Sequence, residues 1–238
     1  DALPIFLVKN AGRIAALPAY RKGLFSIQGE SSMLAALAVE PKPGMQILDV
    51  CAAPGGKTCL MAERMGGSGR VYAWDVYPHR VDLIRAAQRR LWLDNVRPSE
   101  HDATIPLPSM ELGMDAVLAD VPCSGLGVLR EKPDIRLKLS EENMDGLLPV
   151  QARILEAASK MVRVGGLLVY STCTLLPDEN ERQVKQFLNG HPEFEMDDGT
   201  AWLPQMFRDH ARDGMLLLRP DRDGLDGFFI ARMRRSRA

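Results

Sequence analysis

Short runs of aliphatic and β-branched residues alternate, from residue 46 onward, with longer segments in which apolar side chains recur every three or four positions. Runs of the first kind are typical of buried strands, and the longer period is typical of amphipathic helices. The pattern predicts strands at 46–50, 70–75, 115–120 and 166–171, followed by a last strand at 227–233. Because strands that alternate with helices form a mostly parallel sheet with covered faces, we expect an α/β fold.

Two helices between these strands are recognised by their apolar stripes. The first has its stripe at Val81, Ile84, Ala87 and Leu91. The second has its stripe at Ile154, Leu155, Ala158, Met161 and Val162. We expect the second helix to stop at Gly165 and Gly166, because glycine is common just past a helix C-terminus.

The two ends of the chain break this rhythm. We expect residues 1–45 to form an N-terminal extension, with a strand or two and a helix near 31–39, packed on a main domain of residues 46–238. Residues 195–225 are rich in Asp, Gly, Arg and Pro, which favours a long connection before the last strand.

Charge and composition narrow the range of partners. The chain has 30 basic and 31 acidic side chains and a net charge of −1, so any contact with nucleic acid must rely on local patches rather than bulk charge. No apolar stretch approaches the roughly 18 residues of a membrane span, and residues 1–10 lack the basic-then-apolar order of a signal peptide. We expect a cytoplasmic monomer that does not contact a membrane.

The cysteines and histidines show no metal-binding spacing. The four cysteines are too scattered for C-x-x-C pairs, and a reducing compartment argues against disulfides: Cys51, Cys59, Cys123 and Cys173. We therefore expect free thiols and no metal ion.

The segment after the first strand has the composition of a cofactor-binding loop. It closes a hydrophobic strand and opens a helix with small residues that let the backbone approach a ligand. The loop comprises Cys51, Ala52, Ala53, Pro54, Gly55, Gly56 and Lys57. Twenty residues after Gly55 the next strand ends in Asp75, whose carboxylate can accept hydrogen bonds from both ribose hydroxyls of a nucleotide-type cofactor.

Other interpretations of this loop fit less well. Residues 56–58 resemble the end of a phosphate-binding P-loop, but that motif needs glycine where this chain has Cys51. A nicotinamide fingerprint would need G-x-G-x-x-G, which does not occur there. Plain strand-turn-helix packing without a ligand stays as an alternative. The tail of S-adenosylmethionine carries a sulfonium and no phosphate, so it needs no phosphate cradle, and the loop and its following acid favour this cofactor.

Two further acids are expected at the same edge of the sheet. Asp102 follows the third strand-helix unit and could accept the exocyclic amine of adenine, and Asp120 ends the next strand. Each acid alone could be an ordinary loop or helix cap. Ligands of open α/β sheets bind outside the carboxyl ends of the strands, where the loop, Asp75 and these two acids are predicted to meet.

Two cysteines follow strands at this edge as well. Cys123 lies in the segment 120–125 and Cys173 in the segment 171–174. Methylation of cytosine at C5 needs a nucleophile that first adds to C6, and a thiolate can add and later leave. A pair of thiols beside a methyl donor therefore points to pyrimidine C5 chemistry, whereas Cys59, inside the helix after the loop, is expected to be an ordinary buried residue.

The chain resembles a known family, the bacterial Sun/Fmu-type RNA cytosine-5 methyltransferases and their eukaryotic nucleolar relatives. The resemblance covers nearly the whole chain and is carried by residues 28–32, 51–58, 120–125, 132–136, 171–173, 177–180 and 226–229. It implies a Rossmann-like S-adenosylmethionine-dependent methyltransferase fold. It also implies an RNA substrate, with ribosomal RNA expected first and transfer RNA as the alternative.

The resemblance assigns roles that the residue pattern leaves open, since DNA cytosine methyltransferases use the thiol after proline as nucleophile. It implies that Cys173 adds to C6 and that Cys123 assists release of the methylated RNA. It further implies that the loop 51–57, Asp75, Asp102 and Asp120 hold S-adenosylmethionine, with Lys57 helping to orient Asp120. A methyltransferase of another substrate class and a non-catalytic RNA-binding module are the alternatives.

Basic residues cluster in two places. The stretch 125–138 predicts a loop beside the active edge that could contact phosphates through Arg130, Lys132, Arg136 and Lys138. The C-terminus carries a second group, which could be either an RNA contact or a solvated face: Arg232, Arg234, Arg235 and Arg237. A paired cytosine hides C6 within the stack, so the target base must be unpaired or flipped out.

Overall fold

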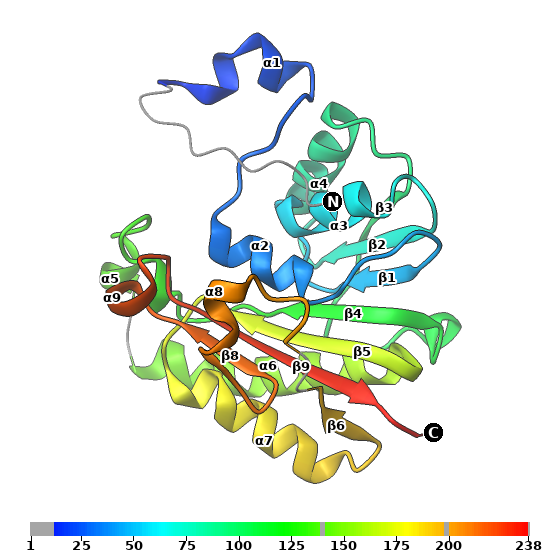
Figure 1. Cartoon of the computed structure of the whole chain (residues 1–238), viewed down its shortest axis with the longest axis vertical. Helices are drawn as coiled ribbons and strands as arrows, with labels where there is room; N and C mark the ends of the chain where they lie inside the picture. Colours follow the sequence, from blue (N-terminus) through cyan, green and yellow to red (C-terminus); the bar gives the residue numbers. More distant parts are fainter. Residues whose placement is uncertain (1–11, 139–140, 198–199, 238) are drawn as a thin grey trace.

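A computed structural model describes residues 12–138, 141–197 and 200–237. Its central feature is one sheet in the order β3-β2-β1-β4-β5-β9-β8-β7, with β6 beside β9. Five strands run parallel: β1 (Gln46–Asp49), β2 (Arg70–Asp75), β3 (Val96–Glu100), β4 (Met114–Asp120) and β5 (Val162–Thr172). The last strand, β9 (Phe228–Arg235), is antiparallel to β5 (Figure 1). The predicted α/β fold with a mostly parallel central sheet is confirmed.

Helices cover both faces of this sheet (Figure 1). One face packs on α2 (Glu30–Leu37), α3 (Gly56–Arg64) and Ile84 of α4 (Pro78–Arg90). The other packs on α6 (Glu141–Met161) and α7 (Glu181–Gly190). Residues of β4 alternate between the two cores, with Ala116 and Leu118 in the first and Val117 and Ala119 in the second. This alternation is the period of a strand buried on both faces.

Short helical turns complete the described chain: η1 (Ile14–Ala16), α1 (Pro18–Arg21), η2 (Pro108–Met110), η3 (Leu126–Val128), α5 (Ile135–Lys138) and η4 (Pro177–Glu179). Within residues 12–45 there is no strand, so the strand expected in the N-terminal extension is not found in this range, while its predicted helix is α2. Proline at the first helical position of α1 fits a helix start better than a strand. None of the helices in the described ranges is long and apolar enough to cross a membrane.

The predicted boundary between the second amphipathic helix and its strand is wrong. Helix α6 ends at Met161, and the chain enters β5 at Val162, before the glycines. Val162 pairs with Met114, and the register of the two strands shifts between Met114 and Ala116. The β-branched Val162 favours extended backbone, and a register irregularity of this kind lets the strand begin early.

The segment expected as a long connection instead extends the sheet. It contains β6 (Phe194–Met196), α8 (Gln205–Arg208), β7 (Ala211–Arg212), β8 (Met215–Leu218) and α9 (Pro220–Asp223). β6 and β8 both pair with β9 in antiparallel register. Leu216 and Leu218 are buried in the core, so tertiary pairing outweighs the polar composition of the segment.

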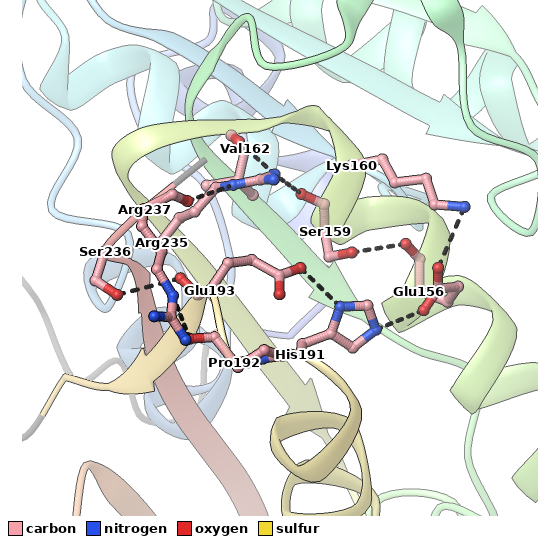
Figure 2. Close-up of polar contacts among 10 residues, drawn as sticks. All are labelled: Glu156, Ser159, Lys160, Val162, His191, Pro192, Glu193, Arg235, Ser236 and Arg237. Atoms are coloured by element: carbon pink, nitrogen blue, oxygen red, sulfur yellow. Dashed lines mark hydrogen bonds and ion pairs between the residues drawn. The ribbon is translucent and has the colours of Figure 1, made fainter.

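The C-terminal arginines make contacts within the fold. Arg232 is buried, and its Nη2 atom lies 2.9 Å from Oε2 of Glu40 and 3.1 Å from Oδ2 of Asp197. Arg234 also pairs with Asp197. Figure 2 shows Arg235 donating to the carbonyls of Ser159 in α6 and Val162 at the start of β5, and Arg237 donating to the carbonyl of Pro192. Arg232, Arg234 and Arg235 are thus held by contacts within the fold, Arg237 is exposed, and an RNA contact of this cluster stays a prediction.

The same end of the sheet is tied down by a histidine between two carboxylates. His191, just after α7, bonds Oε2 of Glu156 through Nε2 at 2.6 Å and Oε1 of Glu193 through Nδ1 at 2.8 Å (Figure 2). Its ring stacks on Phe187. This contact joins α6, α7 and the approach to β6 at the edge away from the parallel strand ends.

Candidate active site

A cavity of about 620 Å³ opens where the parallel strands end. Nine of the predicted site residues line it: Cys51, Ala53, Pro54, Lys57, Asp75, Asp102, Asp120, Cys123 and Cys173. Ala52, Gly55 and Gly56 belong to the same loop but do not line the cavity. The structure thus brings the predicted loop, the three acids and both thiols to one place.

The loop between β1 and α3 is shaped by a left-handed glycine. Gly55 has a φ of 105°, a conformation that favours glycine, and a Cβ there would lie 3.3 Å from Cα of Ile84. Helix α3 starts directly after it, at Gly56. Behind the loop, buried Asp49 accepts a hydrogen bond of 2.7 Å from the hydroxyl of Thr58, and burial raises the pKa of Asp49 to about 7. These contacts fix the turn that faces the cavity.

Two acids lie on the β2–β3 side of the cavity. Asp75 is buried, its Oδ1 atom accepts the amide N–H of Tyr77 at 3.1 Å, and its Oδ2 atom lies 3.4 Å from Nε of Arg80. Asp102 is exposed and accepts hydrogen bonds from the amide and hydroxyl of Thr104, which lower its pKa. Both side chains are therefore acceptors, as hydroxyl and amine groups of a nucleoside require.

Lys57 and Asp120 form an ion pair in the middle of the cavity wall. Nζ of Lys57 lies 2.7 Å from Oδ2 of Asp120, and Oδ1 of Asp120 accepts the hydroxyl of Ser171 at 2.8 Å. Burial lowers the pKa of Lys57, but the charge and hydrogen bond of Asp120 outweigh it, so the pKa is raised overall. The lysine is thus a charged group held by a carboxylate, which argues against the phosphate-binding role of a P-loop lysine.

The two thiols of the cavity touch each other. Sγ of Cys123 lies 3.3 Å from Sγ of Cys173, although 50 residues separate them. The amide N–H of Cys173 also donates to Sγ of Cys123 at 3.3 Å. The loops after β4 and β5 meet here, because Asp120 and Ser171 are register partners in neighbouring strands.

The pKa values of the two thiols shift in opposite directions. The hydrogen bond from the Cys123 thiol lowers the pKa of Cys173 against the effect of burial, and Lys57 and Lys132 lower it further. The same contact and burial raise the pKa of Cys123. These shifts make Cys173 the more acidic thiol of the pair.

The other two thiols are less suited to be nucleophiles. Burial raises the pKa of Cys51 well above its ordinary value, and the nearby acids Asp49, Asp120 and Asp75 add to the shift. Burial also raises the pKa of Cys59, to about 12, and this side chain lies in the core. Cys59 thus has the buried position expected from the sequence.

Several cavity residues had no role assigned to them from the sequence. They come from α2, α4, the segment after η3 and the start of β9: Ser31, Ser32, Arg80, Glu131, Asp226 and Phe228. The motifs at 28–32 and 226–229 were the available signal, and the structure joins them through the hydroxyl of Ser31, which donates to the carbonyl of Asp226 at 2.8 Å. Glu131 lies in the stretch 125–138, which was predicted beside the active edge for its basic residues, so its place in the cavity was indicated but not its acidic side chain.

The basic stretch after Cys123 is partly helical rather than a plain loop. It contains η3 and α5, and Lys132 lines the cavity. Arg130 and Arg136 are exposed beside it. The side chain of Lys138 lies outside the described residues. The segment therefore presents positive charge next to the paired thiols.

The polar side chains that line the cavity fit S-adenosylmethionine. Carboxylates at the ends of β2 and β4 and after β3 offer acceptors for hydroxyl and amine groups, and the one lysine of the loop is already paired with Asp120. Cys51, Ala53 and Pro54 of the loop line the cavity, while Gly55 lets the loop pack closely against Ile84 of α4. No cluster of potential metal ligands is present among the described residues.

Comparison with known proteins gives consistent matches. The family model described as 16S rRNA methyltransferase RsmB/F matches residues 36–234. Proteins named probable ribosomal RNA small subunit methyltransferase B are 40% identical in Synechocystis over 95% of this chain and 41% identical in Bacillus subtilis over 94%. The chain spans about half the length of these curated relatives, 51% in both.

A solved structure gives the same picture of the fold. The crystal structure of NSun6 from Pyrococcus horikoshii with SFG superimposes with a TM-score of 0.80 at 30% identity. The match covers 99% of this chain and 57% of that protein.

Proposed function

The chain belongs to the 16S rRNA methyltransferase RsmB/F family, and on that premise we propose that it methylates C5 of a cytosine in RNA with Cys173 as nucleophile. The methyl donor is S-adenosylmethionine. The observation that carries the proposal is the contact of 3.3 Å between Cys173 and Cys123 inside the cavity that the cofactor acids line. The relatives' names favour small-subunit ribosomal RNA as the substrate.

Cys173 begins the reaction. Its thiolate adds to C6 of the cytosine, so that an S–C6 bond forms, the C5–C6 double bond is lost and C5 becomes nucleophilic. When bound, S-adenosylmethionine supplies the electrophilic methyl group that C5 takes up. Cys123, Lys57 and Lys132 lower the pKa of Cys173, which increases the fraction of this sulfur in the reactive thiolate form.

Lys57 and Asp120 orient the base and the cofactor. Asp120 is fixed from two sides, by Lys57 and by Ser171, and it lies in the wall between the cofactor acids and the thiols. A carboxylate held in this way can accept the exocyclic amine of cytosine. Asp75 and Asp102 hold the cofactor on the other side of the cavity.

Cys123 acts at the end of the reaction. After a base removes the C5 proton, the S–C6 bond breaks, its electron pair leaves with Cys173, and the C5–C6 double bond returns. The Cys123 thiol, 3.3 Å away and with a raised pKa, can donate a hydrogen bond to the departing sulfur.

We further propose that residues 46–238 form the catalytic domain and residues 1–45 an extension packed on it.

Loss of the acid at the end of β2 should weaken cofactor binding. Asp75→Ala removes an acceptor for ribose hydroxyls, and hydrogen bonds to charged groups are worth about 1.5–3 kcal/mol, or roughly ten- to a hundredfold in affinity. Calorimetry with S-adenosylmethionine measures the effect. The matched control is Asp82→Ala, an exposed carboxylate on α4 that pairs with Arg85. Equal affinities for the two variants would remove Asp75 from the binding site.

Charge reversal in the basic stretch should weaken RNA binding and leave cofactor binding unchanged. Replacing Arg130 and Lys132 by Glu is expected to lower RNA affinity roughly ten- to a hundredfold and to reduce its salt dependence. The control reverses Lys42 and Arg70, two exposed residues at the amino ends of β1 and β2 on the opposite edge of the sheet. RNA binding is measured directly, because Lys132 also lowers the pKa of Cys173; if both double variants bound RNA with the parent affinity at physiological salt, this stretch would have no RNA contact.

Mapping of RNA in cells tests the proposed function. Bisulfite converts cytosine but spares 5-methylcytosine, so small-subunit ribosomal RNA from cells with and without the protein should differ at a specific cytosine. The site should reappear when the gene is restored and stay absent with the Cys173→Ala variant. An unchanged map of all RNA classes would refute the proposal.

A further inference from the structure

A buried carboxylate lies directly behind the two thiols. Glu179, in the turn η4 after β5, is 2% exposed. Its Oε2 atom accepts the amide N–H of Ser124 at 2.9 Å and Nε2 of Gln151 at 2.8 Å, and its Oε1 atom accepts the hydroxyl of Ser124. The backbone of Glu179 is anchored as well, because its carbonyl accepts the hydroxyl of Tyr170 at 2.6 Å. A buried carboxylate with this many hydrogen bonds is not explained by ordinary core packing, which an apolar side chain would provide.

The partners of this turn flank both cysteines. Ser124 follows Cys123 in the chain, and its hydroxyl lies 2.8 Å from the hydroxyl of Thr174, which follows Cys173. Asn180, the residue after Glu179, donates to the carbonyl of Thr174 at 3.1 Å and accepts the hydroxyl of Thr172. One turn is thus hydrogen-bonded to the neighbours of both thiols.

Helix α6 joins the same hydrogen-bond network through Gln151. Gln151 of α6 donates through Nε2 to Glu179 and also to the carbonyl of Pro122 at 3.0 Å, the residue before Cys123. The backbone on both sides of Cys123 is therefore tied to one carboxylate, directly at Ser124 and through Gln151 at Pro122. The side chains of Glu179, Ser124 and Gln151 are all buried.

We propose that Glu179 is a positioning residue that holds Cys123 against Cys173, and so sets which thiol is the nucleophile and how fast the product is released. The consequence for catalysis rests on the proposed function, whereas the consequence for the thiols does not. A carboxylate suits this task because both of its oxygens are acceptors, and here they meet donors from Ser124 and Gln151. Glutamine keeps the shape and one acceptor, and the rotatable hydroxyl of Ser124 can accept from its amide. Alanine removes the contact altogether.

The first test measures the thiols without RNA. The rate at which iodoacetamide alkylates Cys173 is followed against pH by peptide mass spectrometry in the parent, Glu179→Ala, Glu179→Gln and the control Asp178→Ala. Asp178 is the neighbouring carboxylate, exposed and paired with Arg182. In Glu179→Ala, Cys173 should lose the hydrogen bond from Cys123. The pH midpoint of its alkylation rate should then rise by about one unit, which means tenfold less thiolate at a pH below the midpoint. Glu179→Gln and Asp178→Ala should follow the parent.

A coincident profile for Glu179→Ala and the parent would overturn the proposal. If Glu179→Ala does not fold, as judged by circular dichroism, Gln151→Met takes its place, because it removes the same tie to Pro122. A shift in the same direction is then expected, and an unchanged profile would overturn the proposal equally.

The second test separates positioning from general loss of structure. With RNA and S-adenosylmethionine, Glu179→Ala should turn over at least tenfold more slowly while a larger fraction of the enzyme is trapped as a covalent RNA complex, because release depends on Cys123. Partial unfolding would instead lower turnover and the complex in proportion, and that outcome would contradict the positioning role. If the alkylation profiles of the parent and the variants are as expected but the parent protein forms no 5-methylcytosine in RNA, the proposed function is refuted and the thiol arrangement stands.

Discussion

Cys173→Ala should form no covalent complex with RNA and no methylated product, whereas Cys123→Ala should form the complex and then stall. The first variant lacks the sulfur that adds to C6, and loss of a nucleophile lowers turnover about 10⁴-fold or more. The second retains that sulfur and loses the thiol that lies 3.3 Å from it. Because the adduct breaks down only after the C5 proton has left, slower elimination accumulates the complex without blocking its formation. A denaturing gel with labelled RNA distinguishes the two outcomes.

Cys59→Ala is the matched control for both variants. Cys59 is buried in α3 and does not line the cavity, so this variant should turn over at close to the parent rate. A complex with Cys173→Ala and none with Cys123→Ala would reverse the assignment of the nucleophile. If neither variant formed a complex with a competent RNA, Cys123 would have no role in release.

Gly127→Ala should disrupt the same site through the backbone. The amide N–H of Gly127 donates to the carbonyl of Cys173 at 2.9 Å, and its carbonyl accepts the N–H of Gly227 at 2.8 Å. A Cβ at Gly127 would lie 2.1 Å from the carbonyl oxygen of Gly227 and 2.8 Å from that of Cys173, so backbone must move. Overpacking costs about 1–3 kcal/mol and here more is expected, because no flexible side chain can give way. Urea unfolding should show a lower midpoint, and methylation should be lost.

Gly146→Ala provides the contrast. Gly146 lies in α6, where a Cβ would have nothing within 4 Å, and alanine is favoured over glycine in a helix by about 0.5–1 kcal/mol. This variant should be as stable as the parent or slightly more stable, with unchanged methylation. A Gly127→Ala variant with the midpoint of the parent would mean that the segments around Gly127, Cys173 and Gly227 do not pack as described.

The parts of the fold that the sequence predicted are those in which local pattern and burial agree. β2 and β4 end in Asp75 and Asp120, and their apolar runs are buried on both faces, so the cavity edge followed from strand order alone. A third strand was expected before Asp102, but its bounds were not predicted, because Arg97, Pro98 and Ser99 give β3 a polar pattern and it has one neighbour, β2. Strands β6 to β8 were missed for the related reason that β6 and β8 depend on pairing with β9, and β7 on pairing with β8.

The site divides in the same way. Cys123 and Cys173 could be placed near each other because each follows a parallel strand, and a loop of small residues marked the cofactor side. The contact of Glu179 with Ser124 joins residues 55 positions apart and has no periodic signal. For the C-terminal arginines the sequence pattern was visible, but it did not reveal their ion pairs. A charged run is the same in sequence whether it faces solvent or pairs with Glu40 and Asp197.

Release of the C5 hydrogen tests the central claim most directly. RNA that carries tritium at C5 of cytosine is incubated with the purified chain and S-adenosylmethionine labelled in its methyl group, and the digested nucleosides are separated. If Cys173 adds to C6 and C5 takes up the methyl group, the label appears in 5-methylcytidine, and one tritium is released to water for each methyl group transferred. Methyl label in another nucleoside, or at cytidine with its tritium retained, would contradict the account.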